Sequence, residues 1–242
     1  MSTITLNDGS HVPWLAFGTG TALYGKDATD FVKVAIENGI THLDGAQIYN
    51  NEDTLAAGIK ASGKPRSELY ITTKLKGLEP AQTAMEALQV SLRKLNMDYV
   101  DLFLIHSPSP ANKEGKLKAL WKEMEEIHSQ GLAKSIGVSN FRVEDLNVIL
   151  DGAKVIPAVN QVKFSFRLSF QSNSARSSCI LTFGKLLSQS MNSVKSAELS
   201  SLRMVVKLQL RELSGDPSMP FSQPFVKGSR KLAANLSLAG RC

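Results

Sequence analysis

The chain has 242 residues, of which 43% are hydrophobic, and this is enough apolar material for one α/β domain with a substantial core. No apolar run approaches the roughly 18 residues of a membrane-spanning helix, and no basic stretch followed by an apolar segment marks a secretory signal. The two cysteines, Cys179 and Cys242, form neither a metal-ligand pattern nor a disulfide framework. We therefore expect a soluble, cytoplasmic protein without a bound metal.

The formal net charge of +6 is unevenly distributed along the chain. Residues 1–166 contain 17 Lys and Arg against 19 Asp and Glu, whereas residues 167–242 contain 11 against 3. A nucleic-acid or membrane-surface binder would need the cations of the last segment to lie on one face. Because the main body is slightly acidic, we expect neither kind of partner.

In chain order, residues 3–6 and 11–13 predict a β-hairpin around the turn Asn7-Asp8-Gly9. Short β-prone runs then alternate with longer amphipathic segments, which is typical of βα repeats. Pro80 is expected in the first turn of a helix, and Gly39 and Gly131 just after helices. We expect strands at residues 15–18, 42–44, 69–73, 99–106, 135–138 and 158–162, and helices at 27–38, 51–62, 80–95, 116–129 and 143–150.

Four polar residues recur at the expected strand ends with the period of one βα unit. Asp44, Lys74, His106 and Ser139 are separated by 30, 32 and 33 residues. Because the carboxyl ends of parallel strands lie on one face, these side chains are expected to converge on a single site. The segment after the first strand lacks the third glycine and the helix of a dinucleotide-binding fingerprint. The pattern therefore favours a (β/α)8 TIM-type barrel, with about six units recognisable.

Beyond residue 166 the βα pattern fails. Residues 167–242 contain 16 Ser, 12 Leu and 6 Arg, which are the residue types encoded by six codons each. One interpretation is a segment translated out of frame or through a retained intron, irregular or disordered. The other is a diverged C-terminal region with amphipathic helices at residues 178–187 and 197–213. We thus expect a partial barrel at residues 1–166 and an atypical basic tail at 167–242.

Several local motifs surround these strand ends. Residues 42–52 contain Asp44 and Tyr49, residues 71–74 end in Lys74, and residues 101–106 end in His106. With residues 15–20, 137–141 and 157–162, these motifs resemble the aldo-keto reductase family, and they occur in the family's order. The resemblance implies NADPH-dependent reduction of an aldehyde or ketone to an alcohol. The sequence does not give the oligomeric state, for which a monomer is the default expectation.

The chemistry of that reaction suits the four residues. Hydride transfer to a carbonyl carbon leaves negative charge on its oxygen, so the site needs a proton donor and a hydrogen-bonding environment. A tyrosine supplies the proton, an adjacent ammonium stabilises its phenolate, and a carboxylate keeps that ammonium charged. The resemblance assigns these roles to Tyr49, Lys74 and Asp44, and makes a neutral His106 the group that orients the carbonyl. Each residue taken alone also fits a structural role, such as a cap or a hydrogen-bonded core side chain.

The resemblance also implies a nicotinamide site. Ser139, Asn140 and Gln161 match the family residues that hold the carboxamide of NADPH, and Thr19 and Asp44 match further cofactor contacts. The Ser139-Asn140 pair equally fits a helix N-cap before residues 143–150.

The remaining cofactor contacts are harder to place. In the family, most of the contacts to the dinucleotide come from the last two βα units, and no residue that would make these contacts can be identified in residues 167–242. The basic run at 227–231 has the charge for a phosphate but lacks the family's context. A truncated, non-catalytic relative therefore stays open as the alternative function.

Two departures from the family concern the substrate pocket. His106 is followed by Ser107-Pro108, where many relatives place a tryptophan before the proline, and Gly20 occupies another common tryptophan position. The loss of two aromatic walls predicts a more open carbonyl site. The sequence does not identify the substrate.

Overall fold

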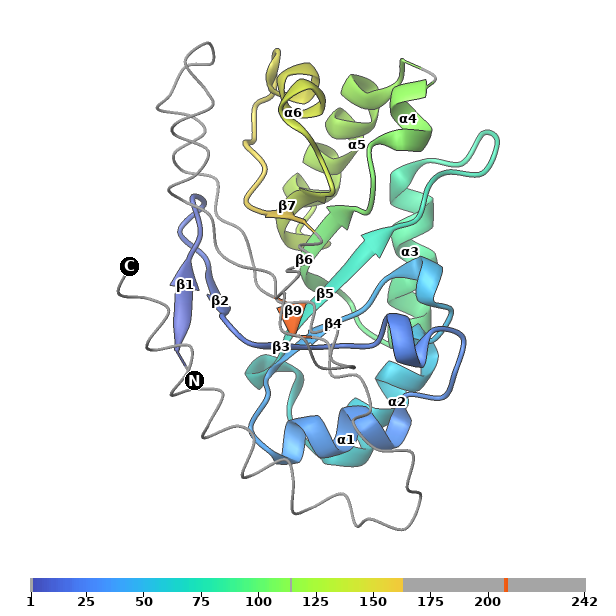
Figure 1. The fold of residues 1–242 in the computed structure, drawn as a ribbon, viewed down its shortest axis with the longest axis vertical. Coiled ribbons are helices and arrows are strands. Elements are labelled where there is room, and N and C mark those ends of the chain that lie inside the picture. The colour runs from blue at the N-terminus through green and yellow to red at the C-terminus, as the bar shows by residue number, and fades with distance from the viewer. Residues whose placement is uncertain (1, 114, 163–206, 209–242) are drawn as a thin grey trace, which may run out of the picture. The chain divides into compact units, whose positions relative to one another are not determined.

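The computed structural model describes residues 2–113, 115–162 and 207–208, all of which belong to the compact unit Met1–Leu210. The chain starts with an antiparallel hairpin of β1 (Thr3–Thr5) and β2 (His11–Pro13) (Figure 1). Six parallel strands follow, and their bounds confirm the six predicted strands to within a few residues. They are β3 (Ala16–Gly18), β4 (His42–Asp44), β5 (Tyr70–Leu75), β6 (Val100–Ile105), β7 (Ala133–Ser139) and β8 (Asn160–Gln161).

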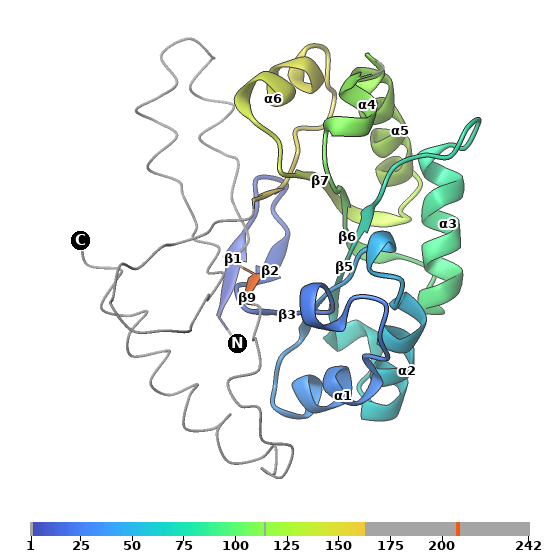
Figure 2. The same ribbon diagram turned by 45° about the vertical axis from the view of Figure 1, so that its right-hand side comes forward.

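Helices connect these strands and lie on the outer side of a curved sheet (Figure 2). Neighbours along the chain are neighbours in the sheet, and a two-residue strand, β9 (Lys207–Leu208), pairs in parallel with β3. This arrangement is a partial (β/α)8 barrel, as predicted. The helices are α1 (Thr29–Glu37), α2 (Glu52–Ser62), α3 (Ala84–Leu95), α4 (Ser109–Lys113), α5 (Leu117–Ser129) and α6 (Val143–Leu150).

Alternation along the strands separates an inner from an outer core. In β6, Leu102 and Leu104 face inward and pack with Leu6 and Val12 of the hairpin, whereas Phe103 packs outward against the helices. Successive side chains of a strand point to opposite faces, and a strand buried on both faces reads as a continuous apolar run. The hairpin therefore lies against the inner face of the barrel, and the helices cover its outer face.

The start of α3 differs from the prediction. The Thr83 hydroxyl accepts a hydrogen bond from the Glu86 N–H at 3.2 Å, and the Glu86 carboxylate accepts one from the Thr83 N–H at 2.9 Å. This capping box starts the helix at Ala84, so the expected helical turn at Pro80 is wrong. Gly39 and Gly131 do follow helices, with φ of +86° and +73°.

Most of the predicted tail lies outside the described residues, including the basic run at 227–231 and the expected helix at 178–187. Residues 207–208 fall within the expected helix at 197–213 but form β9, so that helix prediction is wrong at these two positions. In the part of the chain that the structure describes, no helix is long and apolar enough to cross a membrane.

Candidate active site

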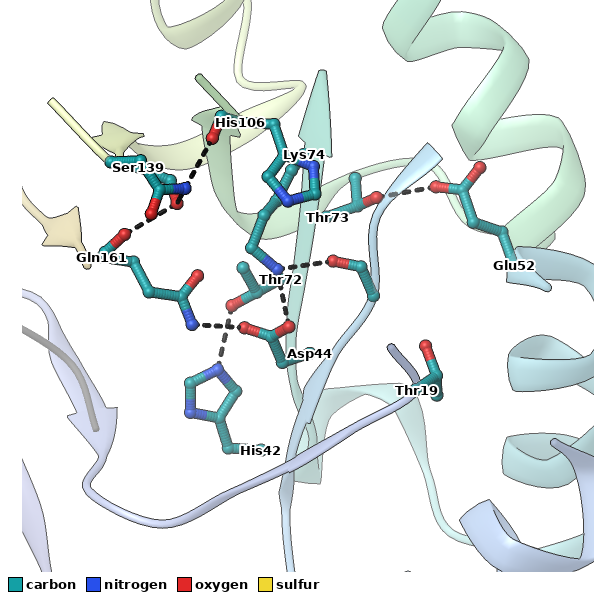
Figure 3. A network of polar contacts seen from close by, with 12 residues as sticks. Thr19, His42, Asp44, Glu52, Thr72, Thr73, Lys74, His106, Ser139 and Gln161 are labelled. Carbon is teal, nitrogen blue, oxygen red and sulfur yellow. Dashed lines mark hydrogen bonds and ion pairs between the residues drawn. The ribbon is translucent and has the colours of Figure 1, made fainter. Parts of the chain in front are cut away.

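A buried ion pair occupies the inner face of the barrel. Lys74 Nζ donates hydrogen bonds to Asp44 Oδ1 at 2.6 Å and to the Gly45 carbonyl at 2.7 Å (Figure 3). The two side chains are 2% and 1% exposed. Both point inward because they share the inner face with Thr72, which pairs with Asp44 in the β4–β5 register. Removing either charge would leave the other buried without its partner, which is strongly unfavourable.

The second carboxylate oxygen of Asp44 contacts the last strand of the half-barrel. Gln161 Nε2 donates to Asp44 Oδ2 at 2.8 Å, and the Thr19 N–H donates to the Asp44 carbonyl at 3.0 Å. Gln161 Oε1 and Thr19 Oγ1 are both buried and make no hydrogen bond to the described residues. A buried acceptor without a partner costs free energy until a ligand or water supplies a donor.

Tyr49 stands between the lysine and His106. It ends the 3-10 helix Gln47–Tyr49, and Asn50 turns the chain with φ of +52°. The Tyr49 ring centroid lies 5.4 Å from Lys74 Nζ. The ring is also edge-on to His106, with centroids 5.6 Å apart at 85°. The structure thus brings all four predicted catalytic residues together.

Ser139 and Asn140 are held at the end of β7. Asn140 Nδ2 donates to the His106 carbonyl and to Ser139 Oγ, both at 3.0 Å, and Ser139 Oγ donates to the Gln161 carbonyl at 2.7 Å. The N-cap of α6 is Arg142, whose N–H donates to the Asp145 carboxylate at 3.0 Å. The capping interpretation of Ser139-Asn140 is therefore wrong, and both residues lie next to Gln161 at the end of β7.

His42 lies on the same inner face, toward the start of β4, and sequence reasoning missed it. Its Nδ1 bonds to the Pro13 carbonyl at 3.1 Å and its Nε2 to the Thr72 hydroxyl at 2.9 Å. Because a carbonyl only accepts, Nδ1 carries the proton and Nε2 accepts from Thr72. Complete burial lowers the pKa of His42 to about 4. Its position two residues before Asp44 in an alternating strand is the signal that could have placed it.

Gly20 fits closely against Tyr49. A Cβ atom at this position would lie 2.8 Å from Tyr49 Cζ and 3.1 Å from both Cε atoms, which is closer than non-bonded carbons approach. With Tyr49 in this place, no larger residue fits here. The Tyr49 ring thus lies against Gly20 and leaves no space for a tryptophan at position 20.

A cavity of about 550 Å³ lies beyond the carboxyl ends of β6 and β7, and of the predicted site residues Asn140 lines it. Ser107, Pro108, Asn140 and Arg142 are among its lining residues. It borders the segment that directly follows His106. None of the described residues that line this cavity is aromatic.

Comparisons with known proteins agree with this geometry. The sequence model of the aldo/keto reductase family matches residues 14–183. The chain belongs to this family, and it has the family's parallel barrel architecture over the described residues.

Among similar proteins, glyoxal reductase of Bacillus subtilis is 40% identical over 168 residues, which cover 69% of this chain and 59% of that one. An NAD/NADP-dependent indole-3-acetaldehyde reductase of Schizosaccharomyces pombe is 41% identical over 164 residues, covering 64% and 57%. The crystal structure of an aldo/keto reductase from Brucella melitensis superposes with a TM-score of 0.61 at 37% identity, covering 67% and 63%. The chain therefore spans less than two thirds of the length of each of these relatives.

Proposed function

We propose that this chain reduces an aldehyde or ketone to an alcohol with NADPH, with Tyr49 as the general acid. The observation that carries the proposal is the position of the Tyr49 ring, 5.4 Å from the Lys74 ammonium and 5.6 Å from the His106 ring. A phenol between a buried cation and an imidazole suits the protonation of an oxygen on which negative charge develops.

Each residue has one task in this proposal. Tyr49 donates its hydroxyl proton to the carbonyl oxygen as charge accumulates there. Lys74, paired with Asp44 at 2.6 Å, stabilises the phenolate that remains. His106 orients the carbonyl by donating an N–H hydrogen bond to the same oxygen.

The residues around Asp44 fit a nicotinamide carboxamide. Gln161 Oε1 is a buried acceptor that has no partner among the described residues, and an amide NH₂ supplies donors for it. Thr19 Oγ1, also buried without a partner among the described residues, suits a further contact to the cofactor. Ser139 Oγ donates to the Gln161 carbonyl at 2.7 Å and Asn140 Nδ2 donates to Ser139 Oγ at 3.0 Å, so both residues lie next to Gln161. When bound, NADPH supplies the hydride. The preference for NADPH over NADH rests on the family, and the Schizosaccharomyces relative is named for both cofactors.

For the substrate we propose small carbonyl compounds, with dicarbonyls such as glyoxal among the first to test. The Bacillus relative is named for glyoxal. The side of the site that follows His106 is formed by Ser107 and Pro108 and borders a cavity of about 550 Å³. The described residues that line this cavity include no aromatic side chain, which suits small, polar carbonyl compounds better than large apolar ones. A monomeric state and a cytoplasmic location stay predictions from the sequence.

The second candidate function is a non-catalytic relative that binds the cofactor too weakly to turn over. The observation in its favour is the extent of the match, which covers 59% of the Bacillus relative. The pyrophosphate and the 2′-phosphate are the charged handles of NADPH, so their contacts contribute a large share of its affinity.

One experiment separates the two candidates. The purified 242-residue chain is titrated with NADPH by fluorescence, and NADPH oxidation is followed with glyoxal and with an aromatic aldehyde. Under our proposal binding saturates, and Tyr49→Phe abolishes turnover while leaving NADPH affinity within about twofold, because the hydroxyl acts only on the reacting oxygen. Tyr99→Phe is the matched control, since Tyr99 packs between Arg66 and Lys134 away from the site. A folded chain without binding at millimolar NADPH would refute the enzyme.

A further inference from the structure

The segment that carries Tyr49 is held from outside the barrel by Gln47. Gln47 Nε2 donates to the Ala87 carbonyl and to Ser91 Oγ, both at 3.0 Å. Its Oε1 accepts from the Lys76 N–H at 3.1 Å. One side chain, two residues before Tyr49, therefore ties this segment both to α3 and to the chain just after β5.

Glu52, three residues after Tyr49, is held by the same helix. Ser91 Oγ donates to Glu52 Oε2 at 3.3 Å, and Thr73 Oγ1 donates to Glu52 Oε1 at 2.6 Å (Figure 3). Glu52 is 2% exposed and Ser91 is fully buried. Burial raises the pKa of Glu52, because removal from water disfavours its charged form.

These bonds run in one direction. The Gln47 amide donates to Ser91, and Ser91 donates its only hydrogen to Glu52, which accepts from both Ser91 and Thr73. Ser91 is thus the link between the two side chains that flank Tyr49. Glu52 also accepts from Thr73 in β5, and Thr73 immediately precedes Lys74. The same hydrogen bonds therefore fix the position of the Tyr49 segment relative to Lys74.

We propose that Ser91 is a positioning residue for the reaction, which through Gln47 and Glu52 fixes the Tyr49 hydroxyl relative to Lys74 and His106. The proposal rests on the proposed function, because it assigns Tyr49 the proton transfer. Ser91 lies between the sheet and the helices, and acts without touching substrate or cofactor.

If Ser91 positions Tyr49, its removal should lower kcat and leave the binding of substrate and cofactor almost unchanged. Displacement of a reacting group by about 1 Å can cost about 100-fold in rate, whereas the residues that hold cofactor and substrate lie on the inner face. We expect Ser91→Ala to lower kcat at least tenfold, with KM and the NADPH Kd changed less than threefold. Its kcat–pH profile should also shift, because the phenol changes its distance from the Lys74 charge.

The matched control is Ser62→Ala. Ser62 is part-buried at the end of α2, and its hydroxyl donates to the Ile59 carbonyl at 2.7 Å, away from Tyr49. This variant should keep the kcat and pH profile of the unmodified chain. Gln47→Leu provides a second approach if Ser91→Ala fails to fold. If both act through one chain of bonds, the Gln47→Leu/Ser91→Ala double variant loses no more activity than the worse single variant.

An NMR measurement that does not depend on turnover tests the role of Ser91 separately from the proposed function. The chain has four tyrosines, so 13C-tyrosine labelling gives a simple NMR spectrum in which Tyr49→Phe assigns the Tyr49 signal. Ser91→Ala should move the Tyr49 signal and Ser62→Ala should leave it in place. No turnover in the unmodified chain would refute the proposed function but not this coupling. An unmoved Tyr49 signal together with unchanged kcat in folded Ser91→Ala would overturn it.

Discussion

Gln161 and Asp44 lie 117 residues apart in the chain and meet at 2.8 Å, amide nitrogen to carboxylate oxygen. This bond joins β8 to β4 across the inside of the half-barrel. The other oxygen of the same carboxylate binds Lys74 at 2.6 Å. Asp44 therefore connects the group proposed to hold the nicotinamide with the group proposed to tune the phenol.

We predict that Gln161→Leu raises the NADPH Kd at least tenfold. The change removes both the bond that orients the amide and the buried acceptor proposed for the carboxamide. A tenfold loss corresponds to about 1.4 kcal/mol, which one hydrogen bond accounts for. Fluorescence titration measures it, with Gln130→Leu, an exposed position on the outside of the barrel, as the control. Equal affinity in the two variants would contradict the assignment.

The Asp44–Lys74 pair should show a large single-variant penalty. Lys74→Met leaves a carboxylate that is 1% exposed without its cation, and such a loss costs about 3–5 kcal/mol of unfolding free energy. In Lys74→Met/Asp44→Leu neither charge of the pair is left, so much of that stability should return while turnover stays absent. Urea unfolding of the two variants makes the comparison. A double variant less stable than Lys74→Met would show that the uncompensated Asp44 charge is not what destabilises the single variant.

Gly20→Ala tests the placement of the tyrosine. The added Cβ would lie 2.8 Å from Tyr49 Cζ, and the end of a side chain moves more easily than backbone does. We therefore expect kcat to fall at least tenfold while unfolding free energy changes by less than about 1 kcal/mol. Steady-state kinetics and thermal unfolding on the same preparation check both parts. Full activity in the alanine variant would mean that Tyr49 works from another position.

The strand-end residues could be predicted because their period is that of one βα unit. Asp44, Lys74 and His106 all lie at or just after the ends of parallel strands, where topology forces them together. Alternation within β5 also separates Lys74 from Thr73, its outward neighbour. The period alone was sufficient to predict that these side chains converge, whereas their proposed roles came from the resemblance to the family.

Other contacts leave no such periodic signal. Ser91 lies 44 residues from Gln47 and 39 from Glu52, and a serine within an amphipathic helix looks the same whether or not it bridges two side chains. The capping box at Thr83 outcompeted Pro80 as the start of α3, because two reciprocal hydrogen bonds outweigh a tolerated proline. The link through Ser91 depends on tertiary geometry, whereas the Thr83–Glu86 capping box is a local sequence signature that could have placed the start of α3.

The buried histidine predicts a pH dependence of stability with a definite sign. Unfolded, His42 titrates near its ordinary value of about 6.5, whereas in the folded protein burial lowers its pKa to about 4. Between these values the unfolded chain binds a proton at His42 that the folded protein does not. Stability from this group is therefore full above pH 6.5, is lost as pH falls toward 4, and changes no further below that. The loss amounts to about 3 kcal/mol.

The charges of Asp44, Lys74 and Asp101 also affect the pKa of the His42 ring. Glu52 makes the stability depend on pH with the opposite sign, because its pKa is raised in the folded protein. The contribution of His42 is therefore taken as a difference between two proteins. In His42→Asn the side-chain amide can still donate to the Pro13 carbonyl, but it does not titrate. Urea unfolding at pH 7 and pH 4.5 should show a larger drop for the unmodified chain than for the variant. In the histidine NMR spectrum, His42 should keep its neutral, Nδ1-protonated form at pH 5. A titration midpoint of His42 near pH 6.5 would show that the ring is hydrated and that its burial does not govern acid stability.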